Sequence, residues 1–312
     1  MRMLDAECRT QNENLLRSMF SILHSGRFMK IITTIDQMHE HALRLRDQGD
    51  RIGFVPTMGF LHEGHLSLMR KARDENHALV VSIFVNPTQF GPGEDYKSYP
   101  RDPEKDATLC RELGCDVLFT PSADEMYPQG FATTVSVSGI TETLCGASRP
   151  GHFDGVATVV TKLFNIVRPH RAYFGLKDYQ QYLVISKLAR DLDMNIKILG
   201  LPTVREEDGL AMSSRNAYLY DDERSGALTL SRSLEAARQM LKEGNRDPRK
   251  IEEKVTAIIR SEPTTKIDYV RVVDADDLTP LSVIEDRALL ALAVFVGEAR
   301  LIDNGILEVN GD

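Results

Sequence analysis

The chain has 312 residues, a length at which about two domains with substantial hydrophobic cores are expected. Lys and Arg number 38 and Asp and Glu number 46, so the formal net charge is −8, and 42% of the residues are hydrophobic. This is the composition of a globular protein, which excludes a disordered chain and a basic surface that coats a polyanion. A phosphate ligand would therefore need a local cluster of donors.

The cysteine content and the apolar runs indicate where such a protein works. The four cysteines, Cys8, Cys110, Cys115 and Cys145, are too few for a disulfide scaffold, so we expect a reducing, cytoplasmic environment. The longest apolar run, at 288–297, has about half the length of a membrane span, and its β-branched residues are typical of a buried strand. We therefore expect no association with a membrane.

From Met29 onward, short apolar runs alternate with amphipathic ones. Strands are predicted at 30–32, 52–55, 79–85, 116–119, 171–174 and 195–199. Helices are predicted from Thr34 to about Gly49, at 66–76, from Asp102 to Gly114, at 155–167 and at 179–192. This alternation predicts an α/β fold with a Rossmann-like, doubly wound parallel sheet.

The pattern changes around residues 202–208. Two helices are predicted at about 222–243 and 248–261, followed by strands near 267–273, 287–295 and 301–309. These elements predict a smaller C-terminal α+β domain. We divide the chain into an N-terminal extension at 1–28, a Rossmann-like domain at 29–203 and an α+β domain at 204–312.

The segment PTMGFLHEGH, from Pro56 to His65, lies between a predicted strand and a predicted helix. Open α/β sheets bind ligands at this position, where the first helical turn offers free N–H groups and a partial positive charge. Gly59 and Gly64 allow a phosphate to come close to the backbone. His62 and His65 share one helical face, and as imidazolium donors they would stabilise the charge of a pentacoordinate phosphorus.

Two other interpretations of the histidine pair stay open on these residues alone. Histidines at this spacing can chelate a metal, although Glu63 does not complete an H-E-x-x-H motif and no third ligand is evident. Alternatively, one histidine caps the helix and the other is a buried core residue.

Two further segments have phosphate-binding chemistry. The segment GLKD at 175–178 follows a predicted strand and precedes a helix, and Lys177 would be a point charge for phosphates. The segment MSSR at 212–215 lies in a polar loop after Val204, where two hydroxyls and a guanidinium suit a triphosphate. Taken alone, this second segment is better interpreted as an ordinary solvated loop.

Together these segments resemble a known family. HEGH at 62–65 and MSSR at 212–215 are similar to the HIGH and KMSKS motifs of the class I nucleotidyl-transferring superfamily. The longer stretches that resemble the pantoate–β-alanine ligase family, in the same order, are PTMGFLHEGH at 56–65, SIFVNPTQF at 82–90, YPR at 99–101, RPGHF at 149–153 and GLKDYQQ at 175–181. The likeness extends from about Met29 to the C-terminus.

The resemblance implies a ligase of pantothenate and coenzyme A biosynthesis. In this family the carboxylate of (R)-pantoate attacks the α-phosphorus of ATP to give pantoyl adenylate and pyrophosphate, and the amine of β-alanine then displaces AMP. No enzyme nucleophile is needed, so catalysis must come from positioning and charge stabilisation. The resemblance also implies Mg²⁺ with ATP and a homodimer, with no nucleic-acid or membrane partner.

The resemblance assigns roles to individual residues. Catalysis is expected to rest on His62, His65, Lys177 and Arg215, with His65 as the proton donor. ATP is expected to lie against Met58, Gly59, Phe60, Leu61, His62, Glu63, Gly64, His65, Gly175, Leu176, Lys177, Asp178, Val204, Met212, Ser213, Ser214 and Arg215. Pantoate and β-alanine are expected to contact Gln89, Gln181, Pro56, Met58, Phe90, Tyr99, Arg149 and His152. Asp106 is expected to be a weak protein contact for Mg²⁺.

The loop at 212–215 departs from the superfamily pattern, because it lacks the lysines of KMSKS. Lys177 and Arg215 would have to supply that charge. We expect the C-terminal domain to close over ATP as a lid hinged near 202–206, which would keep water from the acyl adenylate.

Three alternative functions remain. Another HxGH nucleotidyltransferase, acting on a different acid or on a phosphate acceptor, would favour basic residues where this chain has Gln89 and Gln181. A nucleic-acid-binding relative is disfavoured by the net charge of −8. A silent scaffold on the same fold is disfavoured because the phosphate-binding residues are intact.

Overall fold

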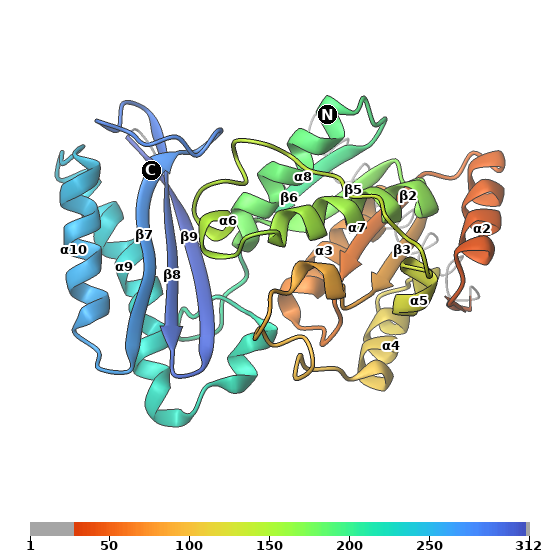
Figure 1. Cartoon of the computed structure of the whole chain (residues 1–312), viewed down its shortest axis with the longest axis horizontal. Helices are drawn as coiled ribbons and strands as arrows, with labels where there is room; N and C mark the ends of the chain where they lie inside the picture. Colours follow the sequence, from red (N-terminus) through yellow and green to blue (C-terminus); the bar gives the residue numbers. More distant parts are fainter. Residues whose placement is uncertain (1–27, 310–312) are drawn as a thin grey trace, which may run out of the picture.

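The computed structural model describes residues 28–309, so the predicted extension at 1–28 lies almost wholly outside the described residues. The larger sheet contains β1 Lys30–Ile32, β2 Ile52–Thr57, β3 Ala78–Ile83, β4 Val117–Phe119, β5 Arg171–Gly175 and β6 Lys197–Leu201. Its strands pair in the order β1-β4-β3-β2-β5-β6, and every pair is parallel (Figure 1). The predicted α/β fold with a doubly wound parallel sheet is confirmed.

Helices cover both faces of this sheet (Figure 1). The long helices of this part are α2 Ile35–Asp47, α3 Glu63–Glu75, α4 Pro103–Glu112, α7 His152–Val167 and α8 Tyr179–Asp191, and α5 Ala123–Met126 and α6 Cys145–Ser148 are single turns. In β3, Val80 faces the core formed with α2, α7 and α8, whereas Leu79 and Val81 face the core formed with α3 and α4. Because both faces are covered, this strand is apolar throughout, apart from Ser82.

The structure moves several predicted boundaries. Helix α3 begins at Glu63 rather than at 66, and α7 begins at His152 rather than at 155. The residues of these first turns are mostly polar or glycine, so they add little to the apolar periodicity from which the helices were predicted. Strand β6 lies at 197–201 rather than at 195–199. Because α3 and α7 begin earlier than predicted, His65 lies in the first turn of α3 and His152 in the first turn of α7.

The C-terminal part contains α9 Arg224–Lys242, α10 Pro248–Arg260 and three strands, β7 Thr265–Asp274, β8 Arg287–Val296 and β9 Ala299–Glu308. The strands form an antiparallel sheet in the order β7-β8-β9, which confirms the predicted small α+β unit. In β8, Leu290 and Leu292 pack in the core with α9 and α10, whereas Leu289 and Ala291 join the core of the larger sheet. The domain boundary at 203/204 stays a prediction.

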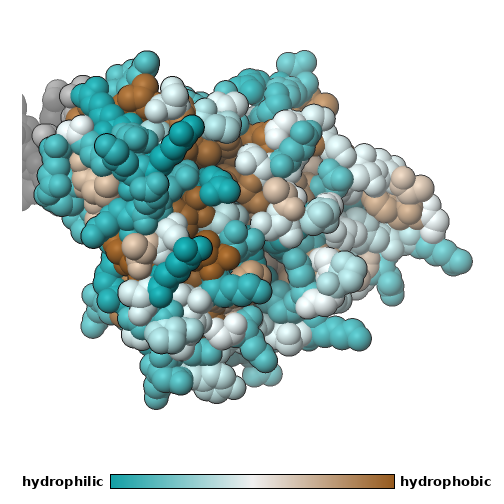
Figure 2. Space-filling model, turned by 60° about the vertical axis from the view of Figure 1, so that its left-hand side comes forward, coloured by the Kyte–Doolittle hydropathy of each residue, from teal (hydrophilic) through white to brown (hydrophobic). Residues whose placement is uncertain are grey.

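Hydrophilic side chains predominate on the face of the molecule that Figure 2 shows. On the face shown in Figure 2, hydrophobic side chains are visible mostly in recesses between hydrophilic ones. Among residues 28–309, no helix has both the length and the apolar character needed to cross a bilayer.

Candidate active site

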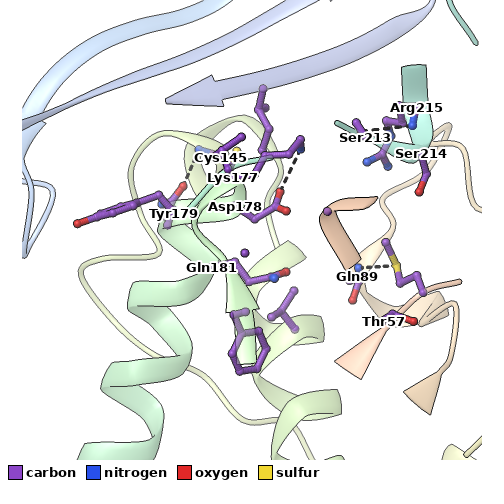
Figure 3. Close-up of a pocket in the computed structure, with 18 of the residues that line it drawn as sticks. Thr57, Gln89, Cys145, Lys177, Asp178, Tyr179, Gln181, Ser213, Ser214 and Arg215 are labelled. Carbon is purple, nitrogen blue, oxygen red and sulfur yellow. Dashed lines mark hydrogen bonds and ion pairs between the residues drawn. The ribbon is translucent and has the colours of Figure 1, made fainter. Parts of the chain in front are cut away.

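A cavity of about 270 Å³ lies where the carboxyl ends of β2 and β5 face the C-terminal part. Figure 3 shows Lys177, Asp178 and Gln181 on one side of it and Gln89 with the loop at 213–215 on the other. The predicted site residues that line it are Pro56, Met58, His62, Gly64, His65, Gln89, Phe90, Tyr99, Arg149, His152, Gly175, Lys177, Asp178, Gln181, Val204, Met212, Ser213, Ser214 and Arg215. The three predicted phosphate-binding segments therefore share one cavity.

Six predicted residues are not part of the lining: Gly59, Phe60, Leu61, Glu63, Leu176 and Asp106. Leu61 is buried in the core that α3 shares with the sheet. Glu63 forms an ion pair with Arg70 on the exposed side of α3. Leu176 packs against the core on the opposite face of the sheet. The side chains of Leu61, Glu63 and Leu176 thus contact other parts of the protein. Any contact of these residues with a ligand in the cavity would come from their backbone atoms.

Asp106 holds the loop before α3. Its carboxylate oxygens accept hydrogen bonds from the N–H of Phe60 at 2.8 Å and from the N–H of Leu61 at 2.7 Å. The residue is 1% exposed, and burial raises the pKa of its carboxyl. Gly59 has φ of +84°, and a Cβ there would lie 2.9 Å from the Asp106 carboxylate. This geometry favours positioning of the loop over the predicted contact with Mg²⁺.

We expect Asp106→Ala to lower the free energy of unfolding by about 1–3 kcal/mol, because the N–H groups of Phe60 and Leu61 lose their acceptor. We also expect weaker ATP binding, because the loop before α3 is no longer held. Urea unfolding and the KM for ATP measure both effects. The Mg²⁺ concentration for half-maximal activity should stay unchanged. A large shift in that concentration without a loss of stability would support the metal contact instead.

The two histidines lie at the start of α3. His62 is its N-cap, and the two rings lie 4.1 Å apart between centroids. The N–H of His62 donates to Nδ1 of His65 at 3.3 Å, so a neutral His65 carries its proton on Nε2. Burial, helped by the charge of Lys177, lowers the pKa of His62 to about 4. Burial, with His62 and Lys177 as smaller causes, lowers the pKa of His65 to about 3. Burial therefore favours the neutral form of both rings at pH 7 over the imidazolium donors expected from the sequence.

This burial makes stability depend on pH. The pKa of His65 falls from 6.5 to about 3 on folding, so below pH 6.5 the unfolded chain binds a proton that the folded chain does not. The contribution of neutral His65 to the free energy of unfolding is fully present above pH 6.5 and is lost as the pH falls toward 3. At pH 5 the loss is about 2 kcal/mol. In urea unfolding at pH 7 and pH 5, His65→Gln should lose less stability than the unsubstituted protein. Equal losses in the two proteins would contradict a neutral, buried His65.

Gln89 ends the short helix η1 Pro87–Gln89 and is held by a chain of polar contacts. Glu94 accepts from the guanidinium of Arg149 at 2.6 and 2.7 Å, and Arg149 donates to Nε2 of His152 at 3.1 Å. Nδ1 of His152 donates to the Gln89 carbonyl at 2.8 Å, and burial lowers the pKa of this histidine to about 4. The Gln89 amide donates to Sδ of Met58 at 3.1 Å. Arg149 and His152 thus fix Gln89 as well as line the cavity.

The loop at 212–215 docks against the larger part of the protein. It leads into η3 Ser214–Tyr218, and both carboxylate oxygens of Asp95 accept from Arg215 at 2.9 Å. The Arg215 guanidinium also lies 5.7 Å from the centroid of the Tyr99 ring. The Ser214 hydroxyl donates to the Phe60 carbonyl at 3.4 Å. The arginine is therefore held at the cavity by residues far from it in the sequence.

Sequence reasoning missed the acidic partners. Glu94 and Asp95 each hold one cavity-lining arginine, Arg149 and Arg215. Two adjacent carboxylates in a glycine-rich loop were the available signal, but an acidic pair on a loop is usually solvated. Asn304 of β9, which also lines the cavity, gave no signal in the sequence.

Comparisons with known proteins identify the family of this chain. The family model for Pantoate-beta-alanine ligase matches residues 30–306. The chain belongs to the pantoate–β-alanine ligase family. Pantothenate synthetase from Moorella thermoacetica is 55% identical over 282 residues, which are 90% of this chain and 100% of that protein. The other nucleotidyltransferases considered from the sequence are not favoured.

Solved structures of the family have the same fold. The crystal structure of pantothenate synthetase from Thermus thermophilus has a TM-score of 0.85 and 48% identity, and the match covers 91% of this chain and 100% of that one. Pantoate-beta-alanine ligase from Francisella tularensis, solved with beta-gamma ATP and beta-alanine, has a TM-score of 0.74 and 37% identity over 91% of this chain and 99% of that one. As a pantoate–β-alanine ligase, this chain condenses pantoate with β-alanine using ATP.

Proposed function

We propose that the cavity performs both steps of this condensation. ATP would lie along the start of α3, the turn at 175–178 and the loop at 212–215, and pantoate would lie beside Gln89 and Gln181. The observation that carries this proposal is that three segments with phosphate-binding chemistry, far apart in the sequence, line one cavity. Pro56, Met58 and Phe90 give the pantoate side an apolar wall for its two methyl groups.

In the first step, a pantoate carboxylate oxygen attacks the α-phosphorus and the bond to the β-phosphate oxygen breaks, which releases pyrophosphate. The transition state gains negative charge on the phosphate oxygens. The neutral Nε2–H of His65 would donate to an α-phosphate oxygen, and Lys177 and Arg215 would stabilise the departing charge.

In the second step, the amine of β-alanine attacks the acyl carbon of pantoyl adenylate, AMP leaves with the acyl-phosphate electron pair, and the amine loses a proton. Both steps need reactants held in line more than they need an enzyme nucleophile. The rigid mounting of Gln89 by Arg149 and His152 supports such a positioning role.

A two-stage assay tests this proposal. With ATP and pantoate alone, we expect one equivalent of pyrophosphate per site, and AMP should appear only after β-alanine is added. Pyrophosphate release that needs neither acid would contradict the proposed order and favour a different acceptor.

We further propose that the C-terminal part is a lid that closes over ATP by a hinge near 202–206. The contacts of Arg215 with Asp95 and of Ser214 with Phe60 support this, because they join the loop at 212–215 to the larger part. We expect the radius of gyration from small-angle scattering to decrease when ATP and pantoate are added together. Superimposable scattering profiles with and without the ligands would count against the lid.

We propose that Mg²⁺ enters with ATP, held mainly by phosphate oxygens and water. Within residues 28–309, no group of three or more His, Cys, Asp or Glu side chains is placed to hold a metal ion.

We also propose a cytoplasmic homodimer, which would have twice the chain mass of 35.0 kDa in light scattering.

A further inference from the structure

Asn304 connects the small sheet to the turn that contains Lys177. It lies on β9, the strand of the small sheet that faces the larger part in Figure 1. Its side-chain amide donates to the carbonyl of Leu176 at 3.0 Å and to the carbonyl of Lys177 at 2.7 Å. These carbonyls belong to η2 Leu176–Asp178, a single 3₁₀ turn between β5 and α8. One amide therefore bridges the backbone on which Lys177 is mounted.

Asn304 is itself anchored by an ion pair whose carboxylate is buried. The side chain of Asp303 is 1% exposed, and its two carboxylate oxygens accept from Arg205 at 2.7 and 3.0 Å. The same carboxylate accepts the N–H of Asn304 at 2.8 Å. Arg205 lies in the predicted hinge and also donates to the carbonyl of Gly209 at 3.0 Å. The hinge, β9 and the Lys177 turn thus form one connected set of hydrogen bonds.

These hydrogen bonds help to set the position of the backbone from which the Lys177 side chain extends. A single 3₁₀ turn has few hydrogen bonds of its own, so the two bonds from Asn304 add to those that hold the Lys177 backbone, and the backbone sets where the ammonium group can reach. Displacement of a positioned group by about 1 Å can cost on the order of a hundredfold in rate. An amide is well suited to this bridge, because its two N–H bonds can serve two carbonyls at once.

We propose that Asn304 is a positioning residue for ATP: it fixes the Lys177 turn and couples the placement of Lys177 to the position of the C-terminal part. The proposal rests on the proposed role of Lys177 in phosphate binding. Asn304→Asp is the sharpest substitution, because it keeps the shape but places a carboxylate oxygen against two carbonyl oxygens. Asn304→Ala removes the donor without that repulsion.

The test is calorimetric titration of the full-length protein with ATP and Mg²⁺ in the absence of pantoate. We expect the Kd for ATP to rise about tenfold in Asn304→Ala and further in Asn304→Asp, with an unchanged number of sites. In steady-state assays the KM for ATP should rise, whereas the KM for pantoate should not. Asn195→Asp, an isosteric change at an exposed residue outside the cavity, is the matched control.

Two results would overturn the proposal. One is an unchanged Kd for ATP in both Asn304 variants. The other is a reduced number of sites at an unchanged Kd, which is what a purely structural role would produce, since it lowers only the folded fraction. Lys177→Ala, titrated in parallel, separates the two proposals: if it loses ATP binding while the Asn304 variants do not, only the role of Asn304 fails. If Lys177→Ala binds ATP normally, the role of Lys177 in ATP binding fails, and the role of Asn304 fails with it.

Discussion

Lys177→Ala is expected to lower the rate of pantoyl adenylate formation by about 10²- to 10³-fold, with no change of fold. The Lys177 ammonium lies in the cavity wall, 3.6 Å from the Asp178 carboxylate, and its positive charge contributes to the lowered pKa values of His62 and His65. A charge held in place before the reaction stabilises the phosphate oxygens of the transition state without reorganisation, and losing one such group costs this much in other enzymes. Pyrophosphate release with ATP and pantoate, without β-alanine, measures the step directly.

Lys187→Ala is the matched control. It removes the same charge from α8, where Lys187 pairs with Asp191 on the outer side of the helix. This control should keep the full rate, and both variants should unfold at the same urea concentration as the unsubstituted protein. Near-normal pyrophosphate release from Lys177→Ala would refute the assignment of Lys177.

The sheet could be predicted because its patterning is strong. Strand β3 is apolar on both faces, and β8 is a long apolar run whose alternate residues enter two different cores. The parallel direction of the strands then follows from the alternation of strands and helices, whereas the strand order was not predicted. The first turns of α3 and α7 could not be predicted in the same way. Gly64 and His65 of α3 and His152 of α7 line the cavity, so these turns follow no apolar period.

The location of the site could also be predicted, because parallel strands bring their carboxyl ends to one edge of the sheet. Its supporting residues could not. Asp106, Asp95 and Asn304 reach the site from separate segments, and only tertiary packing brings them to the residues they hold. The imidazolium form expected for the histidines stays a prediction, but burial lowers their pKa values and favours the neutral form, and burial cannot be read from a motif.

Each of three cationic groups of the cavity has an acidic partner. Arg215 is paired with Asp95, Arg149 with Glu94 and Lys177 with Asp178. In a chain with a net charge of −8, these pairs hold the cations in defined positions without building a broad basic surface. A triphosphate would then enter a site whose donors are already oriented, which lowers the entropic cost of binding.

His65→Ala is expected to lower adenylate formation by about 10²- to 10³-fold, because it removes the Nε2–H donor at the start of α3. His65→Gln should recover much of this loss, since its amide places an N–H donor at a similar distance from the backbone. Pyrophosphate release with pantoate alone measures both variants. Equal losses in the two variants would mean that the ring, and not its N–H, is what the reaction needs.

The pH profile separates a neutral donor from a charged one. The value of kcat/KM reports ionisation of the free enzyme, in which the pKa of His65 is about 3. His65 therefore stays neutral between pH 6 and pH 8 and takes up no second proton, so the profiles of the unsubstituted protein and of His65→Gln should have the same shape. A limb near pH 6.5 that is present in the unsubstituted protein and absent from His65→Gln would show that the imidazolium is the active form.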